Sequence, residues 1–327
     1  MAWCTNSTTV SASDIGDAEG GLVIENHAQR RSPTPAQLAW VERTVGSGAR
    51  VTGRRRMLGG IASTVHRLSL RLPGGTSTHV VLKRFTDPDW GDTQAIAQNE
   101  AAALAAVEAT VVPAPRLLGA SPDGADTDGV PSLLMTRAPG RVWLTPHDLD
   151  AWIRQLATVL PSLHAGKPGA LTDEPEGRDP LTIPASARRP DVWTAAQRLM
   201  DTEAPSGDRV FVHGDYQHFN VLWSRGRLSA LVDWSSSQLG PPDLDVGHCR
   251  LNLAVLYSAE VAERFRYAYE AEAGRRVEPW WDVHQLLSYN DSWQDFIPVQ
   301  VAGRTPVDAR GMTGRVEELL AMAMARL

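Results

Sequence analysis

The sequence predicts a mixed α/β (α+β) fold of two lobes, a small antiparallel β-sheet lobe followed by a larger and mainly helical lobe. Strand-like runs separated by glycine turns dominate residues 50–85, whereas apolar residues recur at helical spacing from about residue 145 onward. With 327 residues, the chain is long enough for both lobes. We therefore expect a loosely held lead-in at 1–32, a first lobe at 33–140 and a second lobe at 141–327.

The first lobe is predicted to begin with a helix and to continue as a sheet. In SPTPAQLAWVERTVG, Thr34 is expected to cap a helix that holds Pro35 in its first turn. Three strand-like segments follow, RVTGRRRML, STVHRLSLRL and HVVLKRF, and the glycine turns between them predict an antiparallel meander. The alanine-rich stretch 94–109 predicts a helix. Two further short apolar segments, VVPAPRLLGA and PSLLMTRAPG, complete the lobe.

The second lobe is predicted to be mainly helical. LDAWIRQLATVLPSLHA has apolar residues at helical spacing, and a loop rich in Pro, Asp and Glu follows at 168–190. RVFVHGDY and RLSALVDW are two short strand-like runs, and the chain from LDVGHCRLNLAVLYS onward is typical of helices. A linker is expected near residues 138–141. Two such lobes would leave a cleft between them, which is a common place for a ligand.

Composition and charge exclude several classes of protein. Hydrophobic residues make up 43% and charged residues 21%, as in ordinary globular proteins. The net charge of −6, all of it on residues 141–327, argues against a nucleic-acid partner. Cys4 and Cys249 cannot form a disulfide framework. The sequence has neither a secretory signal nor an apolar run of membrane-spanning length, so we expect a cytoplasmic protein without a membrane partner. The oligomeric state is not specified.

The segment HGDYQHFN, residues 213–220, carries the strongest chemical signal. Asp215 and Asn220 stand five residues apart between two apolar runs, and Asp233 follows in ALVDWS. Phosphoryl transfer from a nucleotide needs a carboxylate to orient or deprotonate the accepting hydroxyl group. It also needs oxygen ligands from separate chain segments to hold Mg²⁺. These two carboxylates and one amide predict that chemistry.

The same segment resembles the catalytic loop of the aminoglycoside phosphotransferase family, within the protein-kinase-like superfamily, whose pattern is His-Gly-Asp with Asn five residues after the Asp. VDW at 232–234 resembles the family's metal-binding segment. VVLKRF and NEAAAL resemble the segments with its phosphate-contacting lysine and the partner glutamate, and LGGIASTVHRL resembles its nucleotide-covering loop. PSLLMTRAPG resembles the hinge that receives the adenine. These segments follow in the family's order between about residues 36 and 300.

The resemblance implies a two-lobed protein-kinase-like fold and a role for each matched residue. Asp215 would orient the acceptor hydroxyl and act as base, and His213 would support the loop by hydrogen bonds. Asn220 and Asp233 would bind Mg²⁺. The nucleotide, ATP or alternatively GTP, would be bound with the help of Lys83, Glu100, Gly59, Gly60, Ser63, Thr64, Met135 and Arg137.

Some positions depart from the family pattern. His218 and Phe219 stand where many relatives carry a Pro-Gly pair. Gln217 stands where protein kinases usually have a lysine, which favours a small-molecule kinase. Several neighbouring residues are expected to cap helices, brace the loop or serve as structural histidines, namely Asp243, Asp245, His218 and His248.

The catalytic residues do not specify the acceptor. The segment EPWWDVHQLLSYNDSWQDF places carboxylates beside tryptophans, which would suit a cationic acceptor and makes Asp282, Asp291 and Asp295 candidate substrate-binding residues. The alternative is that the tryptophans are core and the acids face water. We expect an aminoglycoside or other basic antibiotic; the alternatives are a metabolite such as choline or homoserine, or a macrolide. A catalytically silent nucleotide-binding regulator is the alternative from another class.

Overall fold

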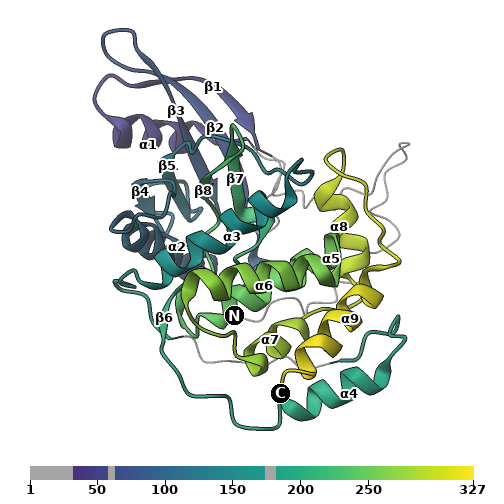
Figure 1. The fold of residues 1–327 in the computed structure, drawn as a ribbon. Helices are drawn as coiled ribbons and strands as arrows, with labels where there is room; N and C mark the ends of the chain where they lie inside the picture. The colour runs from purple at the N-terminus through teal and green to yellow at the C-terminus, as the bar shows by residue number, and fades with distance from the viewer. Residues whose placement is uncertain (1–31, 58–62, 174–181) are drawn as a thin grey trace.

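A β-sheet lobe is stacked on a helical lobe, which confirms the two-lobed α/β fold class (Figure 1). The computed structural model describes residues 32–57, 63–173 and 182–327, so the expected lead-in lies outside the described residues except for Ser32. The elements of the first lobe are α1 (Pro35–Val45), β1 (Arg50–Arg56), β2 (Thr64–Arg71), β3 (Ser77–Arg84), the 3₁₀ turn η2 (Pro88–Trp90), α2 (Thr93–Glu108), β4 (Leu117–Ser121) and β5 (Ser132–Thr136).

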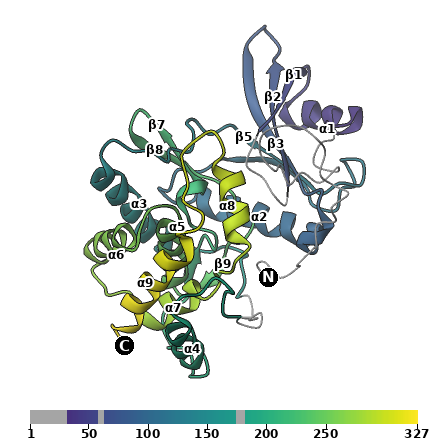
Figure 2. The same cartoon turned by 90° about the vertical axis from the view of Figure 1, so that its right-hand side faces the viewer.

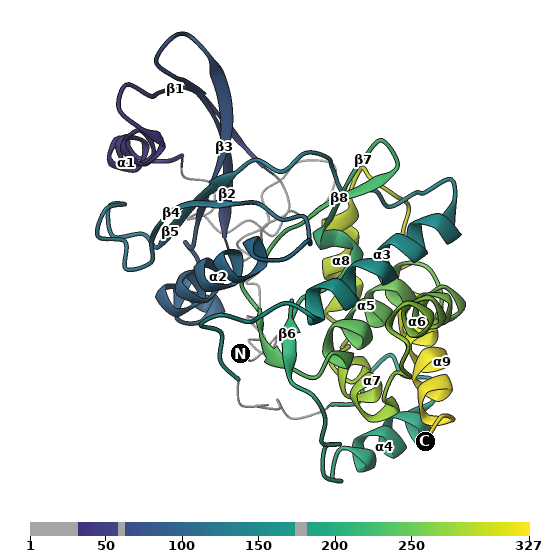
Figure 3. The ribbon, with the colours of Figure 1, turned by 60° about the vertical axis from the view of Figure 1, so that its left-hand side comes forward.

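The five strands form one antiparallel sheet in the order β1-β2-β3-β5-β4, and the predicted three-strand meander is its first half. α1 begins at the predicted cap, because the Thr34 hydroxyl accepts from the Gln37 amide while the Gln37 side chain accepts from the Thr34 amide. Trp40 and Val41 pack this helix on one face of the sheet. Helix α2 lies on the other side, between the sheet and the helical lobe (Figure 3). The sheet therefore presents its second face to the rest of the protein.

The helical lobe also contains two small antiparallel strand pairs, β6 with β9 and β7 with β8, and the β7–β8 pair lies at the upper edge of this lobe in Figure 2. The sequence prediction missed β7 and β9, because runs of three or four residues are too short to show a period. The elements are α3 (Leu149–His164), α4 (Pro190–Leu199), β6 (Val210–Val212), η3 (His218–Asn220), β7 (Val221–Ser224), β8 (Arg227–Leu231), β9 (Gln238–Gly240), α5 (Asp243–Leu256), α6 (Ala259–Ala273), α7 (Pro279–Leu286), α8 (Trp293–Val301) and α9 (Met312–Met324).

One hydrophobic core runs through both lobes. It joins Val81 and Leu133 of the sheet to the apolar faces of α2, α3 and α5. Trp280 and Trp281 also belong to it, so the tryptophan pair at the start of α7 is core. Because the core is shared, the lobe boundary at 140/141 remains a prediction. No helix within the described ranges has the length and apolarity needed to cross a membrane.

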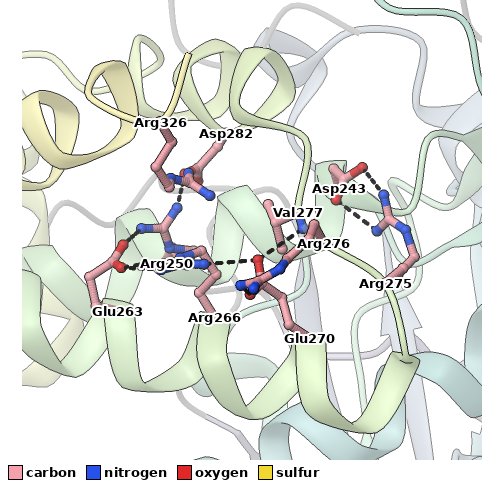
Figure 4. Close-up of polar contacts among 10 residues, drawn as sticks. All are labelled: Asp243, Arg250, Glu263, Arg266, Glu270, Arg275, Arg276, Val277, Asp282 and Arg326. Carbon is pink, nitrogen blue, oxygen red and sulfur yellow. Dashed lines mark hydrogen bonds and ion pairs between the residues drawn. The ribbon is translucent and has the colours of Figure 1, made fainter.

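Helix α5 is buried along nearly its whole length, although it carries five charged or hydrogen-bonding side chains. One of them, Arg250, contacts Glu263 of α6 and Asp282 of α7, and Arg326 reaches the same Asp282 carboxylate. Buried charges of this kind are tolerated only when they are paired. Figure 4 shows the resulting network, whose members are Arg250, Glu263, Arg266, Glu270, Arg276, Val277, Asp282 and Arg326, and beside it the separate pair of Asp243 with Arg275.

Replacing Asp282 by Asn should lower the free energy of unfolding by about 3–5 kcal/mol, because it leaves two arginines without their shared carboxylate in the interior. Asp308→Asn is the matched control. It breaks the ion pair between Asp308 and Arg315. Because the Asp308 side chain is largely exposed, the free energy of unfolding should fall by less than about 1 kcal/mol. Urea denaturation of both variants would test the difference. Equal losses in the two would contradict a structural role for the buried pair.

Candidate active site

The chain turns sharply at Gly214, directly after β6, and this turn places Asp215 at the edge of the lobe. Gly214 has a φ of +78°, and a Cβ added there would lie 1.9 Å from the carbonyl oxygen of Ser236. Only glycine fits this position without displacing the backbone. The catalytic-loop segment and the segment after Asp233 are therefore in direct backbone contact.

Three side-chain donors hold the carboxylate of Asp215. Its Oδ1 accepts from Gln217 Nε2 at 2.5 Å and from His248 Nε2 at 2.9 Å, while its Oδ2 accepts from Asn220 Nδ2 at 2.7 Å. The residue is 5% exposed, so these bonds replace most of its contact with water. Charge-assisted hydrogen bonds of this kind fix both the position and the rotation of a carboxylate.

A second, fully buried carboxylate, that of Asp245, holds the backbone of the catalytic loop. Asp245, in the first turn of α5, accepts from the backbone amides of His213 and Gly214, both at 2.9 Å, and from His164 Nε2 at 3.2 Å. Burial acts to raise the pKa of Asp245, but the hydrogen bond and charge of His164 and the contacts with His213 hold that pKa below its usual value. Asp245 thus remains ionised and ties the loop to α5.

His213 connects the loop to the neighbouring hairpin. Burial lowers the pKa of His213, so its ring is neutral. Its Nδ1 accepts from the Asp215 amide at 3.3 Å, which leaves the proton on Nε2 to be donated to the Val232 carbonyl at 3.2 Å. The ring is therefore a bridge within the loop rather than a proton-transfer group.

The β7–β8 hairpin brings Asn220 and Asp233 to the same end. Asn220 precedes β7 and Asp233 follows β8 by two residues, and the Val232 amide donates to the Asn220 carbonyl at 2.9 Å. Asp233 has a φ of +67°, a strained value for a residue other than glycine. The Nδ2 atom of Asn220 is committed to Asp215, so its amide oxygen is the atom that remains for a ligand.

Lys83 of β3 joins the two lobes electrostatically. Its Nζ lies 2.6 Å from Glu100 Oε2 of α2 and 2.7 Å from Asp233 Oδ1. Burial acts to lower the pKa of Lys83, but the two carboxylates outweigh it and raise that pKa above its ordinary value. Burial likewise acts to raise the pKa of Asp233, yet Lys83 holds it below the usual range. The ammonium group is therefore charged, as contact with phosphate groups would require.

Helix α2 has a second attachment to this site, at Asn99. Its Nδ2 donates to the carbonyls of Ser235 at 2.9 Å and Ser237 at 2.8 Å, and Ser237 Oγ donates to the His213 carbonyl. Neighbouring residues on α2 thus contact Lys83 and the segment that follows Asp233.

Asn220 and Asp233 carry the kind of oxygen atoms that could hold Mg²⁺. Mg²⁺ is usually held by one or two carboxylates together with substrate phosphates, rather than by an all-protein cage. An amide oxygen and a carboxylate at one end of a hairpin fit the ion's preference.

The other candidate nucleotide residues are distributed along the sheet. Gly59 and Gly60 lie outside the described residues. Ser63 is buried just before β2, and the Thr64 hydroxyl lies 3.0 Å from that of Thr86. Met135 is buried near the end of β5, whereas the following Arg137 is exposed.

The three candidate acceptor residues differ in environment. Asp282 has no exposure and pairs with two arginines, which corrects the expectation that it contacts substrate. Asp291 accepts from the Ser186 amide and hydroxyl, so it anchors the loop before α4. Asp295, in the first turn of α8, is exposed and remains a candidate.

Sequence reasoning treated His248 as a structural histidine and gave Asn99 no role. For His248 the signal is present in the sequence, because Asp245, His248 and Asn252 stand at i, i+3 and i+7 and so share one face of a helix. For Asn99 no signal exists, since its partners are backbone carbonyls far along the chain.

Comparison with known proteins gives a family. No curated protein sequence matches the chain. The fold resembles a thermostable mutant of aminoglycoside phosphotransferase APH(4)-Ia in a ternary complex with ADP and hygromycin B, at a TM-score of 0.59 and 17% identity over 88% of this chain and 98% of that one. It also resembles the macrolide 2′-phosphotransferase MphH from Brachybacterium faecium, at a TM-score of 0.50 and 18% identity over 86% and 98%. The profile of the phosphotransferase enzyme family matches residues 59–281, and the chain therefore belongs to that family.

Proposed function

We propose that the protein transfers the γ-phosphoryl group of ATP, with Mg²⁺, to a hydroxyl group of a small molecule. The observation that carries this proposal is the Lys83 ammonium group held between Glu100 and Asp233. The β7–β8 hairpin brings Asn220, and with it Asp215, to the end of the hairpin where Asp233 lies. One site would thus combine a cation for the phosphates, two oxygen ligands for Mg²⁺ and a carboxylate base. GTP is the alternative donor.

Each residue has a defined task in this reaction. Lys83 would hold the nucleotide phosphates, and Asn220 and Asp233 would hold Mg²⁺, which neutralises charge on the phosphate oxygens. Asp215 would orient the acceptor hydroxyl and take its proton as the oxygen bonds to the γ-phosphorus. The bond from that phosphorus to the β–γ bridging oxygen breaks, and ADP leaves. Catalysis then rests on positioning and charge neutralisation.

The acceptor that we favour is an aminoglycoside or another basic antibiotic. The excess negative charge falls on residues 141–327, and the exposed Asp295 lies at the start of α8. Amino groups on an acceptor would be attracted to such a surface. The structural neighbour with hygromycin B supports this class, and the macrolide enzyme supports a macrolide as the alternative. Choline, homoserine or a similar metabolite would need the same catalytic residues.

Acceptor-dependent release of ADP should separate these proposals. A panel of aminoglycosides, peptide antibiotics, macrolides, choline and homoserine would be tested with ATP and Mg²⁺, and we expect stimulation by a cationic antibiotic. Stimulation by a metabolite alone would keep the chemistry and change the acceptor. Binding of ATP without ADP release for any member would favour a catalytically silent regulator.

Asp215→Asn should lower kcat by about 100-fold or more, because an amide cannot accept the hydroxyl proton. Affinity for ATP should stay within about threefold, since Asp215 has no part in holding the nucleotide. Steady-state kinetics and calorimetric titration would measure the two effects. Unchanged turnover would rule out Asp215 as the base.

Asp233→Asn should weaken the Mg²⁺ dependence of nucleotide binding, because it removes a charged oxygen ligand. Asp295→Asn provides a carboxylate-to-amide control outside the Mg²⁺ pair, and its Mg²⁺ titration should match that of the wild type. Identical titration curves for Asp233→Asn and the wild type would contradict the ligand role.

A further inference from the structure

We propose that His248 is a positioning residue that selects which oxygen of Asp215 receives the acceptor proton. The inference rests on the proposed phosphotransfer, and it adds a residue that neither the loop motif nor the metal pair includes. His248 lies on α5, is 8% exposed, and contacts Asp215 Oδ1 through Nε2 at 2.9 Å.

The argument begins with the face of α5 that meets the loop. Asp245 holds the loop backbone, His248 follows one turn later and holds its carboxylate, and Asn252 follows after another turn. The Asn252 Nδ2 donates to the His248 carbonyl at 3.0 Å, within the buried helix. One helix face therefore fixes both the main chain of the loop and its reactive side chain.

The three donors to Asp215 come from different elements of the fold. Gln217 and Asn220 belong to the same loop as Asp215, so they can move together with it. His248 belongs to α5, whose other side is fixed by the pairing of Arg250 with Asp282 and Glu263 (Figure 4). His248 is thus the side chain that connects the carboxylate to the frame of the helical lobe.

Counting lone pairs gives the consequence. Each oxygen of an ionised carboxylate can accept about two hydrogen bonds. Oδ1 of Asp215 already accepts two, from Gln217 and His248, whereas Oδ2 accepts one, from Asn220. Oδ2 is therefore the oxygen that takes the hydroxyl proton, while the acceptor oxygen bonds to the γ-phosphorus and ADP leaves. Without His248 each oxygen would accept one hydrogen bond, from Gln217 or from Asn220, and either oxygen could take the proton.

The hydrogen bond also specifies the tautomer of the His248 ring. Nε2 of His248 lies 2.9 Å from Asp215 Oδ1 and 3.2 Å from the Asn252 amide nitrogen. A hydrogen bond to an ionised carboxylate requires a proton on Nε2, and the Asn252 amide then donates to the His248 carbonyl alone. Nitrogen-15 NMR of histidine-labelled protein reads this proton directly and needs no acceptor. We expect a protonated Nε2 in the wild type and a changed signal in Asp215→Ala. A wild-type ring protonated on Nδ1 alone would overturn the proposal, whatever the activity.

Kinetics of two variants test the role of the bond. In His248→Leu, kcat should fall about 10- to 100-fold while the KM values for ATP and acceptor stay within about threefold, because misplacement of a base by about 1 Å costs about 100-fold in rate. In His248→Gln, an amide donor of similar reach should restore kcat to within about fivefold of the wild type. A role in packing alone predicts no such rescue.

His284→Leu is the matched control, since His284 is a half-buried histidine on α7 that packs against Trp280 and Trp281 and belongs to none of the segments assigned to the site. Its kcat should be unchanged, and thermal unfolding of all variants would show that they are folded. A folded His248→Leu with wild-type kcat, or one that changes only the acceptor KM, would overturn the positioning role. Absence of acceptor-dependent ADP release from the wild type would instead count against the proposed function, and the tautomer would still decide the hydrogen bond.

Discussion

A buried ammonium group is the constraint on which the site depends. Lys83 leaves water only because the carboxyl groups of Glu100 and Asp233 both lie within hydrogen-bond distance of its ammonium group. These carboxylates come from α2 and from the segment after β8, so strand, helix and hairpin must converge on one point. Asn99 strengthens the convergence by attaching α2 to the backbone that follows Asp233. The interlobe geometry is thereby set by electrostatics as well as by the shared core.

Helix α5 supplies the second constraint. The polar side chains of a helix buried on every side need partners in the interior, and α5 finds them on two faces. Asp245 and His248 face the loop that holds Asp215, while Arg250 faces the ion pairs with α6 and α7. The polar side chains of this helix therefore connect the stability of the lobe to the orientation of the reactive carboxylate.

Much of this arrangement could be predicted from the sequence, where local chemistry decides it. The Thr34 cap and the turn at Gly74 and Gly75 between β2 and β3 depend on neighbouring residues, and the structure has both. The strands β7 and β9 escaped prediction because they are only four and three residues long, and β9 also pairs with β6, which lies far from it along the chain. The prediction for Asp282 was wrong because a sequence of tryptophans and acids is the same for a buried helix and for an exposed one. The burial of Asp282 depends on Arg250 and Arg326, which come from other parts of the chain.

The contrast between α5 and α8 bears on how such a protein can change over evolution. Nearly every residue of α5 has partners on all sides, so a substitution there must be matched by others before it is tolerated. Helix α8 has only Ile297 and Val301 buried among its nine residues. If α8 contributes to acceptor binding, as we propose, mutations that adapt the protein to a new acceptor can accumulate there one at a time, while α5 holds the proposed catalytic loop in place.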